Sequence, residues 1–288
     1  MPGLKKILLF AGPCLCFFAG CSFRSLALHS TSEILDAGKA AYYDEADPEL
    51  AKEAMASQLK LLEVLLKNEP DDKRLNALAA ESFGGYSFLF IEDSQPQRAK
   101  AFYLRSRDYA LKALGPQWLA LSQKPLDDFE LALATSQKAD VPALFWAAFS
   151  WAGLINLSRD TPAAVAEMPK AVALMKRSQE LDASYDFAGA DLFFAVYFAS
   201  RPKILGGDTA KAEELFAEAQ RLTGGQYLMI YLLEAKTLAV AMQDRARFQT
   251  LLDKVRDSPA GILPGSRLAD ETAKLKAEAL RGKIDELF

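Results

Sequence analysis

Residues 208–244, DTAKAEELFAEAQRLTGGQYLMIYLLEAKTLAVAMQD, are the stretch of this chain that decides which fold the sequence predicts. Apolar side chains recur through it at the spacing of one helix face, and no part alternates in the manner of a strand. Ala212 and Ala219 are small enough to let a second helix pack closely. We therefore expect helices over 209–222 and 226–242 that pack together as a helical hairpin.

A second stretch of the same kind lies nearer the N-terminus, in residues 48–83, PELAKEAMASQLKLLEVLLKNEPDDKRLNALAAESF, with Pro70 at the turn between its helices. Further helices are expected over 32–43, 95–114, 127–134, 141–158, 162–181, 185–200, 245–257 and from Arg267 onward. The sequence thus predicts an all-α fold of stacked αα-hairpins, similar to a divergent tetratricopeptide superhelix that lacks a clean repeat of about 34 residues. We expect one such domain over 32–288.

Two local features of this array can be predicted in detail. Asp47 is expected to cap a helix that has Pro48 at its first position, where proline is preferred. The buried face of that helix should carry Ala51, Met55, Leu59, Leu62 and Leu66. Gly84-Gly85 predicts a close helix crossing at which no side chain fits, with a kink that opens a cavity as the alternative.

The first twenty residues have the layout of a secretory signal peptide. Lys5 and Lys6 precede an apolar run over 7–18, and two small residues stand directly before Cys21. This end is similar to a bacterial lipoprotein signal, which implies removal of residues 1–20 and attachment of acyl chains such as palmitate to Cys21. Residues 21–31 would then be an acylated tether. The alternative is a transmembrane anchor, but the apolar run is shorter than the roughly 20 residues needed to span a bilayer.

The residue after the cysteine bears on location. Ser22 stands there in place of an aspartate. By analogy with lipoprotein sorting in enteric bacteria, this favours a protein held in the outer membrane and facing the periplasm.

Composition argues against catalysis, cofactors and metal binding in the mature domain. The last of the three cysteines is the acylated one, and the single histidine, His29, lies in the tether. No disulfide, no cysteine or histidine metal site and no Ser-His-Asp unit is therefore expected. Without residues 1–20 the chain has 32 basic against 38 acidic residues, so its net charge changes from −4 to −6. With no basic run and no phosphate-binding glycine loop, nucleic acid is not an expected partner.

The helices expected over 141–158 and 185–200 are rich in aromatic residues and should lie close together. A helix that is apolar on all sides is buried, and rings packed from two helices can leave gaps between them. We predict a ligand cavity whose wall carries Trp146, Phe149, Phe194 and Tyr197. The alternative is an ordinary dry core.

The loop that follows these helices, over 201–207, ends in Gly206-Gly207 and Asp208. Its glycines can adopt positive φ, and Asp208 is placed to cap the next helix, which is a sufficient local role. The functional alternative is that Lys203, Gly206, Gly207 and Asp208 form a rim that contacts a partner or ligand.

From about Leu66 to Phe288 the chain resembles the TatT family, the lipoprotein T components linked to TRAP (tripartite ATP-independent periplasmic) transporters. The resemblance is carried by RPKILGGDTAKAEELFAEAQRLTGGQYL, EAKTLAVAMQDRARFQTLLDKV and RLADETAKLKAEALRGKIDELF, with DVPALFWAAFSWAGLINLSRD and VAEMPKAVALMKRSQELDASYDFAGADLFF upstream. Arg201 stands where the family usually has a tyrosine or similar residue before the Pro-Lys pair.

This resemblance implies a tetratricopeptide-like protomer that assembles as a homotrimer and binds the substrate-binding P component of a TRAP transporter. It also implies an apolar cavity or pore that could pass a small apolar or amphipathic ligand, in a protein without enzymatic activity. Two other functions stay open from the residues alone. One is a tetratricopeptide scaffold lipoprotein in outer-membrane or envelope assembly, and the weaker one is a carboxylate-based hydrolase.

Overall fold

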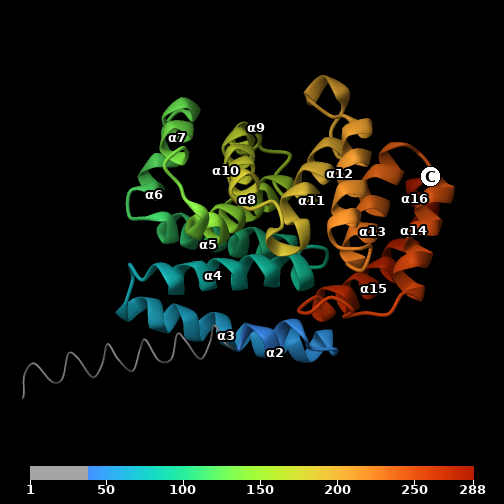
Figure 1. The fold of residues 1–288 in the computed structure, drawn as a ribbon, viewed down its shortest axis with the longest axis horizontal. Coiled ribbons are helices and arrows are strands. Elements are labelled where there is room, and N and C mark those ends of the chain that lie inside the picture. The colour runs from blue at the N-terminus through green and yellow to red at the C-terminus, as the bar shows by residue number, and fades with distance from the viewer. Residues whose placement is uncertain (1–37) are drawn as a thin grey trace, which may run out of the picture. The chain divides into compact units, whose positions relative to one another are not determined.

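A computed structural model describes residues 38–288, and within them the chain is helical with no strand (Figure 1). The α-helices are α2 (Lys39–Tyr43), α3 (Pro48–Asn68), α4 (Lys73–Tyr86), α5 (Pro96–Leu114), α6 (Trp118–Leu121), α7 (Leu126–Leu133), α8 (Val141–Asn156), α9 (Pro162–Ala166), α10 (Met168–Leu181), α11 (Tyr185–Ala199), α12 (Thr209–Leu222), α13 (Leu228–Glu234), α14 (Arg245–Asp257), α15 (Arg267–Arg281) and α16 (Ile284–Leu287). Residues Ala40–Phe288 form one compact unit. The predicted all-α class is confirmed. The predicted signal peptide, Cys21 and the tether lie outside the described residues.

Helix starts follow the capping chemistry that the sequence predicts. The Asp47 carboxylate accepts hydrogen bonds from the backbone N–H groups of Glu49 and Leu50, at 3.0 and 3.2 Å, and Pro48 opens α3. These bonds satisfy amide groups that have no partner inside the helix. The predicted inner face of α3 is buried as expected, at Ala51, Met55, Leu59, Leu62 and Leu66.

Helices that follow one another along the chain pack against each other. Helix α4 lies between α3 and α5, α5 packs on α8, α8 on α10, and α11 on α12 (Figure 1). Gly84 marks a close approach of α4 to α5 and α8, because a Cβ atom there would lie 2.8 Å from Ser150 Oγ and 2.9 Å from Ser106 Oγ. The predicted close crossing at this glycine is confirmed. The superhelical, tetratricopeptide-like character of the array stays a prediction.

Several of the predicted helices differ in the structure, among them those expected over 162–181 and 185–200. The expected helix over 162–181 is two helices, α9 and α10, because Pro169 lacks the N–H group that would continue the α9 ladder. In α11 the backbone of Asp186, Phe187 and Ala188 is left-handed, with φ of 52°, 57° and 60°. Regular right-handed helix therefore begins after Ala188, and the tertiary contacts of this turn override the local helical pattern.

Two segments have π-helical hydrogen bonding: η1 (Ser87–Ile91) after α4, and η4 (Ala235–Ala239) after α13. Short 3₁₀ segments, η2 (Lys138–Asp140) and η3 (Lys203–Leu205), lie in connections. π-Helical turns occur mostly as single turns and often at functional sites.

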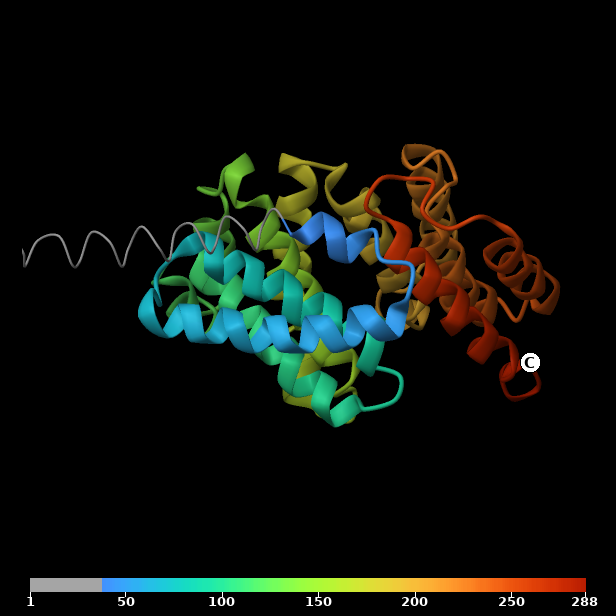
Figure 2. The same cartoon turned by 90° about the horizontal axis from the view of Figure 1, so that it is seen from below.

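The C-terminal helices gather at one side of the compact unit, in orange to red in Figures 1 and 2. Among them, α15 returns to the N-terminal helices and packs on α3 and η1. Leu268 of α15 is buried in the same core as Met55 and Leu59, and Lys276 donates a hydrogen bond to the carbonyl of Phe88 at 2.6 Å. The last long helix thus closes the array against its beginning.

Within residues 38–288, no helix combines the length and the apolar composition that crossing a membrane requires.

Candidate functional site

A cavity of about 650 Å³ lies inside the helical array. Its walls are mostly apolar and come from helices far apart in the sequence, from α2 through α15. The size falls in the range of roughly 300–1,000 Å³ that is typical of small-ligand sites. The apolar lining includes Met55, Phe88, Leu89, Phe145, Trp146, Phe149, Ile155, Phe187, Leu192, Phe193, Val196, Tyr197, Tyr227, Met229 and Leu233.

Three of the four residues predicted for a cavity wall line this cavity. Trp146 and Phe149 lie on α8, with ring centroids 5.3 Å apart, and Tyr197 lies on α11. Phe194 is not among the lining residues; its ring packs on Phe193 and Phe198. Asp186 and Phe187 of the left-handed turn line the cavity. In the right-handed part of α11 and at the residue after it, the residues that line it as well are Gly189, Leu192, Phe193, Val196, Tyr197 and Ser200. Their spacing is that of one helix face, and Phe194 lies about 100° around the helix from Phe193.

Contacts at the start of α11 fix which face of the helix points into the cavity. A Cβ atom on Gly189 would lie 2.6 Å from the ring of Phe145, so the α11 backbone packs directly on that ring. In the left-handed turn, Phe187 stacks on Tyr227 with centroids 4.7 Å apart. Because a left-handed turn costs about 1–2 kcal/mol per residue, these contacts must hold it in place.

Buried phenol–carboxylate pairs interrupt the apolar lining. Tyr103 donates a hydrogen bond to Glu92 Oε2 at 2.6 Å, and Tyr43 donates one to Glu81. Burial and the adjacent carboxylate raise the pKa of both tyrosines well above the ordinary value. These phenols therefore stay protonated and act as hydrogen-bond donors. They place polar groups on the wall without leaving them unpaired.

An ion cluster lies where this cavity adjoins a smaller one of about 300 Å³. Asp93 accepts hydrogen bonds from Lys236 at 3.0 Å and from Lys276 at 2.7 Å. Burial alone would raise the pKa of Asp93, but the charges of Lys276 and Lys236 outweigh it and lower the pKa to about 2. Asp93 follows η1 and Lys236 belongs to η4, so both π-helical segments contribute to this wall.

The loop after α11 reaches the cavity through different residues from those predicted. Arg201, Pro202 and Leu205 line the cavity, whereas Lys203, Gly206, Gly207 and Asp208 are not among its lining residues. Gly206 has the expected positive φ, 85°, and Asp208 caps α12 by accepting from Lys211 N–H at 3.0 Å.

Gly207, the second glycine of this loop, does not have a positive φ; it is required because the backbone packs closely there. A Cβ atom on Gly207 would lie 1.8 Å from the carbonyl oxygen of Arg201, so only glycine fits there. The local cap and turn account for Gly206, Gly207 and Asp208. A rim role for these residues and Lys203 stays a prediction.

Sequence reasoning missed Phe193 and Arg201 as lining residues. Phe193 lies four residues before Tyr197 and therefore on the same helix face, so helical spacing could have indicated it. Nothing in the sequence, however, shows which face of α11 points inward. In the described part of the chain, no group of three or more His, Cys, Asp and Glu side chains could hold a metal ion.

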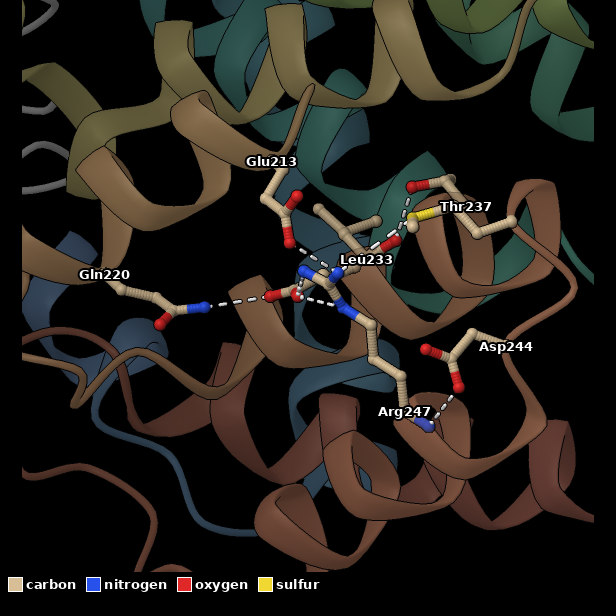
Figure 3. A network of polar contacts seen from close by, with 8 residues as sticks. Glu213, Gln220, Leu233, Thr237, Asp244 and Arg247 are labelled. Carbon is tan, nitrogen blue, oxygen red and sulfur yellow. Dashed lines mark hydrogen bonds and ion pairs between the residues drawn. The ribbon is translucent and has the colours of Figure 1, made fainter. Parts of the chain in front are cut away.

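A second polar network lies among α12, α13 and α14 and has a structural role (Figure 3). The Arg247 guanidinium donates to Glu234 at 2.6 and 3.0 Å and to Glu213 at 2.6 Å. Gln220 donates to the other oxygen of Glu234 at 2.8 Å. The nearly buried Glu234 carboxylate is thus fully paired, and the network ties three helices together.

Two comparisons with known proteins show what the chain is similar to. The chain is 22% identical over 311 aligned residues to an uncharacterized protein of Treponema pallidum (strain Nichols), covering 97% of this chain and 96% of that protein. The sequence model of the TRAP transporter T-component family, TAtT, matches residues 44–288. That match spans nearly all of the described helices, so the chain belongs to the TRAP transporter T-component family.

Proposed function

We propose that this protein is a lipid-anchored T component that binds the substrate-binding P component of its TRAP transporter and exchanges a small apolar or amphipathic ligand with it. The family match over residues 44–288 gives the coarser statement, an accessory of a TRAP transporter. The observation that supports a ligand role is the 650 Å³ apolar cavity inside this accessory. No catalytic step is part of the proposal.

The anchor and the assembly belong to the same proposal. Acyl chains on Cys21 would hold the protein in the cell envelope, in the outer membrane with the helical domain in the periplasm. More than one acyl chain is needed for lasting membrane attachment, and a lipoprotein cysteine carries more than one acyl chain. Three copies would assemble as a homotrimer, as the family resemblance implies.

Crosslinking in intact cells tests the partner. The lipidated protein would be crosslinked, purified by an affinity tag and analysed by mass spectrometry. We expect a TRAP substrate-binding protein in near-equal amount, and trimeric crosslinks of the chain with itself. Recovery of outer-membrane assembly proteins in its place would reject the transport role and support the scaffold alternative.

A matched variant tests the anchor separately. A variant with Cys21→Ser, in which a secretory signal peptide cleaved independently of that cysteine replaces residues 1–20, removes the acylation site but leaves the helical domain unchanged. We expect this variant in the soluble periplasmic fraction, still able to bind the P component in solution. If the variant remained in the membrane fraction, the proposed acyl anchor would be wrong.

A further inference from the structure

Arg201 differs from the charged groups of the ion cluster around Asp93. Asp93 and Lys236 neutralise each other, and Lys276 adds a further positive charge beside Asp93 and Glu92. Arg201, by contrast, makes no ion pair and no side-chain hydrogen bond with any residue in the range 38–288. Its guanidinium carbon lies 4.2 Å from the centroid of the Tyr197 ring. A partly buried positive charge thus lines a mostly apolar cavity and has no ion-pair partner among residues 38–288.

The arginine is held in a fixed position. Stacking on Tyr197 occupies one face of the guanidinium, and its N–H groups point outward along the edges, where they can bind a carboxylate with two hydrogen bonds. The backbone is fixed too, because Gly207 packs on the Arg201 carbonyl and Asp208 N–H donates to Phe198 at 3.0 Å. Such a group loses little freedom when it binds an anion.

Most of the cavity-lining residues that neighbour Arg201 along the chain are apolar. Val196 and Phe193 lie on the same face of α11 as Tyr197, and Leu205 lies in the loop after Arg201. Arg159, after the end of α8, adds a second positive charge to the lining, and it donates to the neutral Asn156 side chain at 3.3 Å. An apolar wall beside unneutralised arginines is complementary to a molecule with an apolar chain and an acidic head.

We propose that the cavity binds an amphipathic anion, an apolar chain with one carboxylate, and that Arg201 binds the carboxylate. This assignment rests on the proposed ligand role of the cavity, and it adds the chemical class of the ligand. It makes Arg201 a specificity-determining residue that separates acids from alcohols and amines of the same chain length.

Binding of three ten-carbon probes to the isolated protein tests this assignment. The chain without residues 1–21, which lacks the apolar signal segment and the acylation site but keeps the whole compact unit, would be titrated by calorimetry with decanoate, decanol and decylamine. We expect decanoate to bind at least tenfold more tightly than decanol, and decylamine to bind most weakly. Raising KCl from 50 to 500 mM should weaken decanoate binding and leave decanol binding unchanged, since salt screens the charge contact.

Variants at Arg201 locate the headgroup. Arg201→Gln should weaken decanoate binding about tenfold or more without changing decanol binding, and Arg201→Lys should retain more of the affinity because it keeps the charge. Arg98→Gln is the matched control, because Arg98 also stacks on aromatic rings, those of Tyr86 and Phe102, but does not line the cavity. Thermal unfolding of each variant would confirm that the fold is intact.

Two results would overturn the proposal, and they are distinguishable. Equal affinity for decanoate and decanol, unchanged in Arg201→Gln, would reject the anionic class and leave an apolar ligand cavity in place. Binding of none of the three probes would reject the ligand cavity itself, and with it the ligand-exchange part of the proposed function. Neither result depends on the P component, whose binding is tested separately by crosslinking.

Discussion

Adjacent glycines in α4 have opposite structural roles. Gly84 faces the crossing with α5 and α8, where Ser106 Oγ and Ser150 Oγ are 2.5 Å apart and Ser106 also donates to the Ala80 carbonyl at 2.6 Å. Gly85 faces the cavity, and a Cβ atom placed on it would lie 4.0 Å from its nearest neighbour, a ring carbon of Trp146. One position has no room for a side chain and the next has room.

Gly84→Ala is therefore expected to destabilise the protein by about 1–3 kcal/mol, because the new methyl group must displace the serine pair and separate the helices. Gly85→Ala, the matched control, should be neutral or stabilising by up to about 1 kcal/mol, since alanine favours helix more than glycine does. Thermal unfolding measures both, at roughly 2–4 °C per kcal/mol for a domain of this size. Equal effects of the two substitutions would show that the crossing is not tight at Gly84.

Asp93 gives a stability term that depends on pH. Its pKa falls from the ordinary 3.8 to about 2 in the folded protein, so the folded state favours the charged form. The stabilisation is fully present above the unfolded pKa, near pH 4, and is lost as pH falls through the folded pKa, near pH 2. Because half of the side chain is exposed, solvent weakens the ion pairs and the effect should be modest.

Urea unfolding of the wild type and Asp93→Asn between pH 6 and pH 2.5 measures this term. The wild type should be the more stable at pH 6, and the difference should shrink below pH 4. A difference that stays constant over this range would show that the Asp93 carboxylate is not paired with the lysines in solution.

At the scale of elements, Asp270 joins α15 to the start of α13. This buried carboxylate accepts hydrogen bonds from Leu228 N–H at 2.8 Å, Gly261 N–H at 3.0 Å and Ser266 Oγ at 2.7 Å. It thus caps the first turn of α13 from 42 residues further along the chain. The α13 sequence offers no side-chain cap of its own.

Asp270→Ala should destabilise the protein by about 3 kcal/mol, since it leaves buried donors without acceptors. Asp270→Asn should cost less, because its amide oxygen can still accept. The exposed Asp285→Ala is the control and should have no measurable effect, although Asp285 pairs with Arg245 at 2.8 Å. Urea unfolding compares the three variants, and an effect of Asp270→Ala no larger than that of the control would contradict the capping role.

At the scale of the whole molecule, two aromatic rings at the cavity wall join the apolar cores. Phe149 packs against both the central core around Trp151 and the N-terminal core around Phe83. Phe88 packs against the N-terminal core and the C-terminal core around Phe248. The two rings meet edge to face, with centroids 5.4 Å apart. Contacts of this kind couple helical arrays that would otherwise unfold in parts.

Phe88→Ala should lower stability by about 2–3 kcal/mol, less than for a fully buried ring, and split a single unfolding transition into two. Calorimetry would show this as a van't Hoff enthalpy that falls below the calorimetric one. Phe90→Ala is the matched control, because Phe90 packs against the N-terminal core alone. It should lower the midpoint and keep one transition. If Phe88→Ala also kept a single transition, coupling between the cores would not pass through this ring.

The sequence by itself determined the helical class, most helix ranges, the Asp47 cap, the buried face of α3 and the close crossing at Gly84. The crossing depends on Gly84, because a glycine inside a helix commonly marks a place where another helix packs closely. Most of the other features depend on residues within a few positions of one another. The cavity wall was predictable in part for the same reason: Trp146, Phe149 and Tyr197 are large rings on two apolar helices.

Only the tertiary structure decided which face of α11 points inward, and so placed Phe193 in the cavity lining in place of Phe194. It also decided the left-handed turn at Asp186–Ala188, the unneutralised charge of Arg201 and the pairing of Asp93 with Lys236 and Lys276, 143 and 183 residues away. Such features arise when distant helices pack, because the packing contacts outweigh the small local preferences of the backbone.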